Sequence, residues 1–296
     1  MKPPKFAYAA PETLAEALEL LAEGGPDARL LAGGQSLVPA MNFRLARPSL
    51  LIDLGSVPGL RGLRRGDDGG LVAGPMTRHR DFERSALARE LLPIAHAAMP
   101  NIAHLAIRNR GTIGGSLAHA DPAGDWPALG LACNAKITVR STSGTREVAA
   151  RDFGRGLFET ALQSGEMVSE IGFPRWGESL RWGLQKMARR RGDFAIVGVV
   201  VVGEIGTDEI CSNLRIVVYG AADCACLVPE AQGVLEGRVP TAARVAEASR
   251  AAAGAIATRS DLHASAAYRT ELIEALTQRA LWQAFGEVVP AVSRAA

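Results

Sequence analysis

The chain has 296 residues, of which 48% are apolar and 22% are charged, and its formal net charge is +2. This length suits roughly two domains of about 150 residues, and the nearly balanced charge argues against an extended nucleic-acid surface. The four cysteines, Cys133, Cys211, Cys224 and Cys226, include one C-x-C but no C-x-x-C. The chain therefore lacks the thiol spacing of an iron–sulfur cluster. We expect buried thiols in a reducing compartment.

The first residues, Met1–Lys5, lead into a polar helix and not into the apolar region of a secretory signal. The longest apolar run, Ala195–Val202, is far shorter than the ~20 residues that a membrane helix needs. We therefore expect a cytoplasmic protein without a membrane span.

The N-terminal unit is predicted to be a mixture of short helices and strands. Thr13–Glu16 has the pattern of a capping box, apolar residues then recur at helical spacing, and Gly24–Gly25 ends the helix. The pattern next predicts a strand, a short helix and a second strand over Ala28–Leu31, Leu37–Leu45 and Leu50–Leu54. We end this unit at residue 55.

The middle unit, residues 56–175, is predicted to contain two hairpins with helices between them. Turn residues 66–70 join the first pair of strands. The hairpins are expected at Leu60–Arg65 with Leu71–Gly74, and at Lys136–Arg140 with Thr145–Val148. The helices are expected at Ala86–Ala98 and Asp125–Ala132. Composition changes near 174–178, where we place the next boundary.

The C-terminal unit, residues 176–296, is predicted to be a three-stranded antiparallel sheet covered on one face by two helices. The strands are expected at Leu180–Met187, Ala195–Glu204 and Ile210–Tyr219, with short connections typical of a meander. The helices are expected at Thr241–Ala257 and Ala264–Phe285. The whole chain is therefore predicted to have an α+β fold.

Two glycine-rich segments stand out as candidate ligand loops. We call Ala32, Gly33, Gly34, Gln35 and Ser36 the first glycine segment, and Gly111, Thr112, Ile113, Gly114, Gly115 and Ser116 the second. Glycine tolerates positive φ and lets a backbone approach a ligand closely, and successive N–H groups in a turn can bind an anion. Each segment alone could be a simple tight turn. Together they favour a ligand with two phosphates.

Other motifs are absent or ambiguous. The sequence contains no G-x-G-x-x-G after a strand, no P-loop and no G-x-S-x-G elbow, and its five histidines are scattered. We expect His119 to be a loop residue that bonds to backbone. Asp125 either accepts from a ligand hydroxyl or caps a helix. Lys186 either contacts the ligand or is a solvated lysine at a sheet edge, and Arg189–Arg191 beside Asp193 suggests a local contact.

The combined motifs resemble one flavoprotein family. Ala32–Pro39 followed by Arg44–Ala46, then Gly111–Ser116 and Asp121–Asp125, are similar in order and spacing to the FAD-binding medium subunit of molybdenum hydroxylases. That is the family of xanthine dehydrogenase and aerobic carbon monoxide dehydrogenase. The resemblance covers essentially the whole chain, up to the helix that contains Tyr268.

The resemblance implies a two-subdomain FAD-binding fold of the vanillyl-alcohol oxidase (PCMH) type, followed by a C-terminal α+β domain. It also implies that the two glycine segments clasp the FAD pyrophosphate. Asp125 corresponds to a flavin-side aspartate and Lys186 to a lysine near the isoalloxazine ring.

Four positions depart from the family pattern. Gln35 stands where many relatives have histidine, and Ser116 and His119 stand where asparagine is frequent. These changes exchange one polar group for another. Phe194 replaces a tyrosine that lies against the flavin in carbon monoxide dehydrogenase-like subunits. Stacking would survive without the hydroxyl, which leaves flavin tuning and the choice of acceptor open.

By this resemblance the chain is an electron-transfer subunit with neither a catalytic residue nor a metal of its own. A large partner would hold the molybdenum cofactor and oxidise the substrate, and a small partner would hold two [2Fe–2S] clusters, in a dimer of heterotrimers. FAD would pass the electrons to an acceptor, which could be NAD, a quinone, a cytochrome or oxygen. Residues 86–106 are a candidate docking surface.

Two alternatives remain at this stage. A self-contained flavin oxidase or reductase would need a substrate base, and Tyr219, His263 and Tyr268 are not convincing candidates. A flavin-free assembly protein is disfavoured because all the paired glycines of the two segments are intact. The substrate of the holoenzyme stays open among N-heteroaromatic compounds, alkaloid-like ketones, acyl-CoA thioesters and carbon monoxide.

Overall fold

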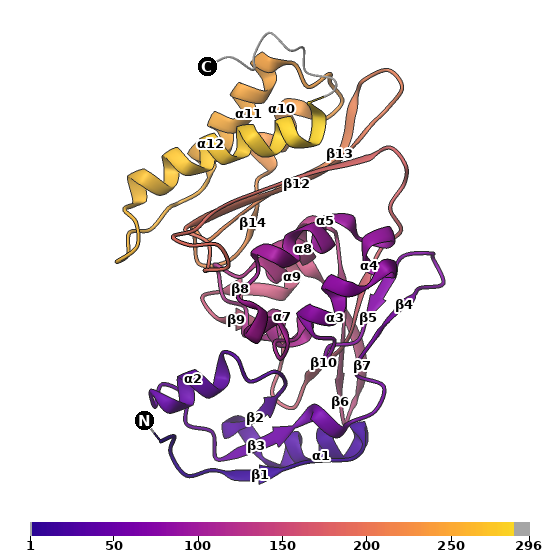
Figure 1. Cartoon of the computed structure of the whole chain (residues 1–296), viewed down its shortest axis with the longest axis vertical. Helices are drawn as coiled ribbons and strands as arrows, with labels where there is room; N and C mark the ends of the chain where they lie inside the picture. The colour runs from indigo at the N-terminus through magenta and orange to yellow at the C-terminus, as the bar shows by residue number, and fades with distance from the viewer. Residues whose placement is uncertain (1, 287–296) are drawn as a thin grey trace.

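The computed structural model describes residues 2–286, which form three main sheets stacked along the long axis of the molecule (Figure 1). The N-terminal sheet lies at one end and the last helices at the other, with a larger sheet and its helices between them. Within residues 2–286, no helix is both long and apolar enough to cross a membrane.

The first sheet is parallel, with the order β1-β3-β2. Its strands are β1 (Ala7–Ala9), β2 (Ala28–Leu31) and β3 (Leu50–Asp53). Helix α1 (Leu14–Glu23) packs on the sheet, and α2 (Leu37–Asn42) follows the first glycine segment. The amide of Glu16 donates to Thr13 Oγ1 at 3.1 Å, so the predicted cap of α1 is confirmed.

The second sheet has five antiparallel strands in the order β4-β5-β10-β6-β7. They are β4 (Leu63–Arg65), β5 (Leu71–Ala73), β6 (Lys136–Ser141), β7 (Gly144–Ala149) and β10 (Met167–Phe173). Both predicted hairpins are present. The central strand β10 was not predicted, because a bulge between Val168 and Glu170 interrupts its alternation of apolar and polar residues.

Short helices accompany this sheet. They are α3 (His79–Arg84), α4 (Ala86–Leu91), α5 (Pro93–Ala98), α6 (Leu105–Arg108), α7 (Ile113–His119), α8 (Asp125–Ala132) and α9 (Ala150–Phe153), with a small hairpin β8 (Gly154–Gly156) and β9 (Glu159–Thr160). Among these helices, α4, α7 and α9 pack against the sheet. The single helix predicted over 86–98 is two helices. Leu92 leaves helical geometry at φ −143° and ψ 62° because it precedes Pro93.

The third sheet has four strands, so the prediction of three was wrong. They are β11 (Leu180–Met187), β12 (Val197–Ile205), β13 (Cys211–Tyr219) and β14 (Cys226–Leu227), in that order. The fourth strand is too short to show a period in the sequence. The helices are α10 (Pro229–Leu235), α11 (Ala242–Ala255) and α12 (Ala266–Phe285), and the last two were expected.

The third sheet is buried on both faces. Val199 and Val201 of β12 belong to the core under the C-terminal helices, whereas Val200 and Val202 belong to the core shared with the second sheet and α8. Figure 1 shows β12 and β13 running between α11 and α12 on one side and α5 and α8 on the other. This sandwich brings residues of β11 and β13 to the beginning of α8.

Candidate functional site

The two glycine segments lie directly against each other, although they are far apart in the sequence. A Cβ atom added to Gly33 would lie 2.2 Å from the carbonyl oxygen of Arg110 and 2.8 Å from the Cα of Gly111. A Cβ on Gly115 would lie 3.5 Å from that of Ala32. Only glycine fits at position 33, because any side chain would push the two segments apart.

The first glycine segment keeps its backbone donors free. Among the acceptors in residues 2–286, none receives a hydrogen bond from the amides of Gly33, Gly34, Gln35 or Ser36. Gly34 adopts a φ of +72°, and the Gln35 side chain donates to the Gly33 carbonyl at 3.0 Å, which closes the turn. The Ser36 hydroxyl precedes α2 without capping it. This row of donors fits a phosphate group.

The second glycine segment is different, because most of its amides are already bonded within the protein. The amide of Ile113 donates to Thr77 O at 3.0 Å and that of Gly114 to Pro75 O at 2.9 Å. A Cβ on Gly114 would lie 2.4 Å from the Pro75 Cβ. The amides of Ile113 and Gly114 are thus already engaged and are not free for the pyrophosphate that the two segments are expected to clasp. Gly114 allows α7 to pack on the chain at Pro75.

Two side chains of the second glycine segment have distinct roles: Thr112 caps a helix, and Ser116 offers a hydroxyl group. Thr112 caps α7, because its Oγ1 accepts from the amide of Gly115 at 3.1 Å. The Gly111 amide donates to Ile107 O at 2.7 Å. The Ser116 side chain is half-buried and supplies a hydroxyl that a ligand can reach. The second glycine segment therefore packs closely against neighbouring backbone and offers a ligand one hydroxyl group, that of Ser116.

A buried histidine that sequence reasoning missed supports the second glycine segment. His79 begins α3, its amide donates to Gly111 O at 3.0 Å, and its Nε2 lies 3.3 Å from Ser116 Oγ. Burial lowers the pKa of His79 to about 4, and the charge of Arg108 acts in the same direction while a backbone contact with Thr112 opposes it. The ring is therefore neutral near pH 7. A lone histidine in the sequence carries no signal of this role.

Asp125 and Lys186 meet in a buried ion pair. Lys186 Nζ lies 2.9 Å from Asp125 Oδ2 and donates to Asn101 O at 3.1 Å, and the Tyr219 hydroxyl donates to Asp125 Oδ1 at 2.8 Å. Both charged side chains are less than a tenth exposed. The alternative readings were therefore wrong: Lys186 is not a solvated edge residue, and Gly124 is the residue at the N-cap of α8.

Burial dominates the electrostatics of this cluster. It raises the pKa of Asp125, while the charge of Lys186 and the hydrogen bonds from Lys186 and Tyr219 act in the opposite direction. Burial and the neighbouring carboxylate raise the pKa of Tyr219 well above its usual value. Tyr219 therefore stays protonated as a donor and cannot serve as the base of a self-contained oxidase.

Other predicted residues have mixed outcomes. The expectation for His119 was wrong: it is the last residue of α7, its ring lies 5.1 Å from that of Phe158, and its side chain has no hydrogen-bond partner within residues 2–286. Arg190 pairs with Asp193 at 3.1 Å, which confirms a local contact. Phe194 is 60% exposed.

Comparison with known proteins matches two family models to the chain. Residues 4–176 match the FAD binding domain in molybdopterin dehydrogenase, and residues 182–284 match the CO dehydrogenase flavoprotein C-terminal domain. The nicotine 6-hydroxylase medium subunit of Paenarthrobacter nicotinovorans is 40% identical over 96% of this chain and 99% of that protein. The carbon monoxide dehydrogenase medium chain of Hydrogenophaga pseudoflava is 37% identical over 95% and 97%.

The fold comparison agrees with these matches. A carbon monoxide dehydrogenase structure from Hydrogenophaga pseudoflava, which lacks the Mo-pyranopterin moiety of its cofactor, superimposes with a TM-score of 0.94 at 37% identity. The match covers 97% of this chain and 100% of that one. The chain therefore belongs to the family of FAD-binding medium subunits of molybdenum hydroxylases.

Proposed function

We propose that this chain binds one FAD with its pyrophosphate against the first glycine segment. The observation that carries the proposal is the row of free amides from Gly33 to Ser36, placed where the two glycine segments touch. Ser36 and Ser116 add hydroxyl donors beside that row. When bound, FAD supplies an electron carrier that can take up electrons and hand them to a separate acceptor.

In this proposal the chain is the electron exit of a larger enzyme and not the place where substrate is oxidised. A large partner holds the molybdenum cofactor and a small partner holds two [2Fe–2S] clusters, in a dimer of heterotrimers. The names of the relatives as medium subunits and medium chains support this division. The free cysteines are in keeping with a cytoplasmic location.

We also propose that the chain divides into three structural units, at residues 1–55, 56–175 and 176–296.

Asp125 and Lys186 stay in the proposal as flavin-side residues, with a role limited by their mutual contact. The charges of Asp125 and Lys186 neutralise each other, and the Tyr219 hydroxyl occupies the second oxygen of Asp125. Neither residue therefore has a full charge free for a ligand. Their contribution is to hold β11 and β13 against the start of α8, which fixes the wall beside the proposed flavin position. We assign no catalytic residue to this chain.

The proposed docking surface for the cluster-bearing partner is narrower than residues 86–106. Most apolar side chains of α4 and α5 lie inside the core. His104, Leu105 and Ala106 are exposed, and Leu105 is 50% exposed. The large apolar side chain that the segment leaves open to a partner is therefore Leu105, at the start of α6 (Leu105–Arg108). The other exposed residues of α4 and α5, Ala86, Arg89, Glu90 and Ala97, are charged or small.

The similarity does not select a substrate. The identities to the nicotine and carbon monoxide relatives, 40% and 37%, are nearly equal. This is expected if the substrate is bound in the large partner, because selection for substrate then acts on another chain.

The test of the proposal is rapid mixing of the assembled enzyme with its substrate, before and after removal of FAD. We expect the cluster absorbance of the FAD-free enzyme to bleach as in the intact enzyme, while reduction of a flavin-dependent acceptor is lost. Clusters that stay oxidised in a complex with full molybdenum and iron content would place this chain in the substrate chemistry and refute the exit role.

A further inference from the structure

The Ser116 hydroxyl does not bond as a helical serine usually does. Ser249 on α11 donates to Val245 O at 2.8 Å, which is the common bond from a helical hydroxyl to the carbonyl four residues earlier. The matching acceptor for Ser116 on α7 is Thr112 O. Instead, the only partner of the Ser116 hydroxyl within residues 2–286 is the imidazole of His79, whose Nε2 lies 3.3 Å from Ser116 Oγ.

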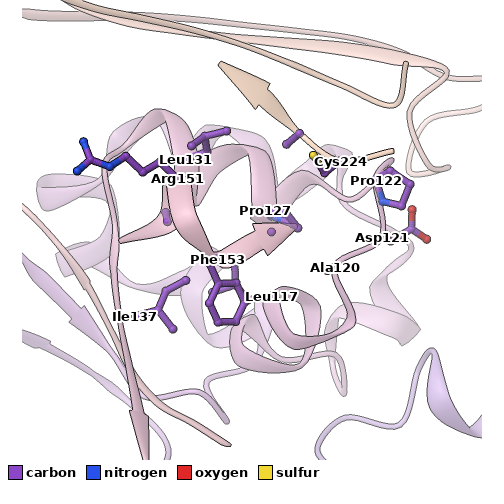
Figure 2. A pocket seen from close by; sticks show the side chains of 13 residues that line it. Leu117, Ala120, Asp121, Pro122, Pro127, Leu131, Ile137, Arg151, Phe153 and Cys224 are labelled. Atoms are coloured by element: carbon purple, nitrogen blue, oxygen red, sulfur yellow. The ribbon is translucent and has the colours of Figure 1, made fainter. Parts of the chain in front are cut away.

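The packing of α7 fixes the direction in which Ser116 points. Leu117, the next residue, is buried and lines a small pocket whose walls also include Phe153 (Figure 2). Cys224 lines the same pocket and, like Cys226, is half-buried, so the expectation of buried thiols was wrong for these two residues. Consecutive residues of a helix point in directions about 100° apart. The anchored Leu117 therefore holds Ser116 on a different side of α7.

The ring of His79 is held just as firmly. Its side chain is 4% exposed, and its centroid lies 6.1 Å from that of the Trp126 ring. The His79 amide donates to Gly111 O at 3.0 Å. A Cβ added to Gly111 would lie 3.2 Å from His79 Cε1, so the glycine leaves room for the ring. A ring packed on these sides keeps one orientation toward Ser116.

The position of the ring proton follows from the partners of the two ring nitrogens. Nδ1 is buried and has no hydrogen-bond partner in the described part of the chain, whereas Nε2 faces Ser116 Oγ. The Thr112 carbonyl lies near the ring, but it already accepts from the Ser116 amide at 3.0 Å. Buried N–H groups without an acceptor are rarer than buried acceptors without a donor. The proton of the neutral ring therefore belongs on Nε2, and the Ser116 hydroxyl keeps its own proton to donate elsewhere.

We propose that His79 is a positioning residue for the cofactor: its Nε2–H donates to Ser116 Oγ and thereby aims the Ser116 hydroxyl proton at a phosphate oxygen of FAD. This inference rests on the proposed function, which places the pyrophosphate where the two glycine segments touch. Gly115 lies at that contact, because a Cβ on it would be 3.5 Å from that of Ala32. The half-buried Ser116 side chain follows directly. A hydroxyl donates about twice as strongly to an ionised oxygen as to a neutral one.

The first test locates the ring proton in the full-length chain without FAD. At pH 7, a long-range proton–nitrogen NMR spectrum of histidine-labelled chain separates protonated from unprotonated ring nitrogens. His79→Gln identifies the His79 signals by their loss. We expect a protonated Nε2 and an unprotonated Nδ1. A proton on Nδ1 would overturn the proposal, because Ser116 would then donate to the ring and not to a ligand.

The second test is a double-mutant cycle on FAD affinity, measured by titration of the folded apoprotein. Ser116→Ala should weaken binding about tenfold and His79→Leu about fivefold. The double variant should bind as Ser116→Ala does, because His79 acts through that hydroxyl. His79→Gln can donate from its amide in place of Nε2–H and should recover most of the affinity. The control Ser249→Ala, on α11, should leave the affinity unchanged.

Losses that multiply in the double variant would overturn the proposal, since His79 would then act on binding through the fold and not through Ser116. Wild-type chain that does not bind FAD would refute the proposed function, and with it the phosphate role of Ser116. The ring proton would still decide separately whether His79 donates to Ser116. That spectrum needs neither His79→Leu nor FAD, so a variant that fails to fold does not remove the test.

Discussion

The ammonium of Lys186 and the carboxylate of Asp125, which lie 61 residues apart in the chain, form an ion pair of 2.9 Å that is almost closed to solvent. Lys186 belongs to β11 and Asp125 to α8, so the pair joins the third sheet to the helices of the second. Charges removed from water are tolerated only when each finds a partner. The packing of the third sheet on the helices of the second sheet therefore depends on both members of this pair.

Removing one member of this pair should be costly. Lys186→Met leaves the Asp125 carboxylate buried without its cation and should lower the free energy of unfolding by about 3–5 kcal/mol. Urea denaturation measures this loss. The double variant Lys186→Met with Asp125→Asn should recover part of it. As a control, Arg64→Met breaks the exposed pair with Glu170 and should cost less than about 1 kcal/mol.

Gly33→Ala should weaken FAD binding more than about tenfold, or about 1.4 kcal/mol. The new Cβ would meet the Arg110 carbonyl and separate the two glycine segments. Titration of the folded apoprotein with FAD gives the affinity. The matched control is Gly254→Ala on α11, where a Cβ meets nothing within 4 Å, and it should leave the affinity unchanged. An equal affinity for both variants would contradict the proposed site.

His79 should make stability depend on pH. Its folded pKa of about 4 is lower than the usual 6.5, so the unfolded chain binds a proton that the folded chain refuses. Stability is therefore complete above about pH 6.5 and falls as the pH drops toward 4, by about 2 kcal/mol at pH 5. Urea denaturation at pH 8 and pH 5 tests this. In His79→Gln the pH-dependent loss should be smaller by that amount.

The flavin should be bound without a covalent bond. Neither glycine segment contains a cysteine or a histidine, the residues that usually form such bonds. Acid or heat denaturation should therefore release one FAD per chain into the supernatant, where chromatography identifies it. Flavin that stays with the precipitated chain would contradict this prediction, and a well-folded apoprotein that does not take up FAD would contradict the cofactor assignment.

The sequence predicted the local features of the fold and site well. The strand at Ala28–Leu31, the cap at Thr13 and both hairpins depend on neighbouring residues, whose pattern is visible in the sequence. The glycine segments were visible for the same reason. Their contact through Gly33 and Arg110 was not, because it depends on how distant elements pack.

The glycines also show why the rest could not be predicted. A glycine that lets a ligand approach and one that lets another backbone approach look the same in a sequence. Gly114 turned out to be of the second kind, with Pro75 as its neighbour. Tyr219 is similar, because nothing around it in the sequence indicates a partner at Asp125. The contact between Tyr219 and Asp125 depends on how β13 packs against α8, and residues close to either one in the sequence do not determine that packing.

The burial of β12 on both faces has a consequence for how the molecule comes apart. Alternate valines of one strand contribute to two cores at once, so neither core can lose its structure while the other keeps it. Heating should therefore unfold the second sheet, the third sheet and the C-terminal helices in a single calorimetric transition. A fragment that ends at residue 176 would expose the apolar side of α8 and should aggregate. The C-terminal half is thus a required part of the flavin-binding half's folding unit.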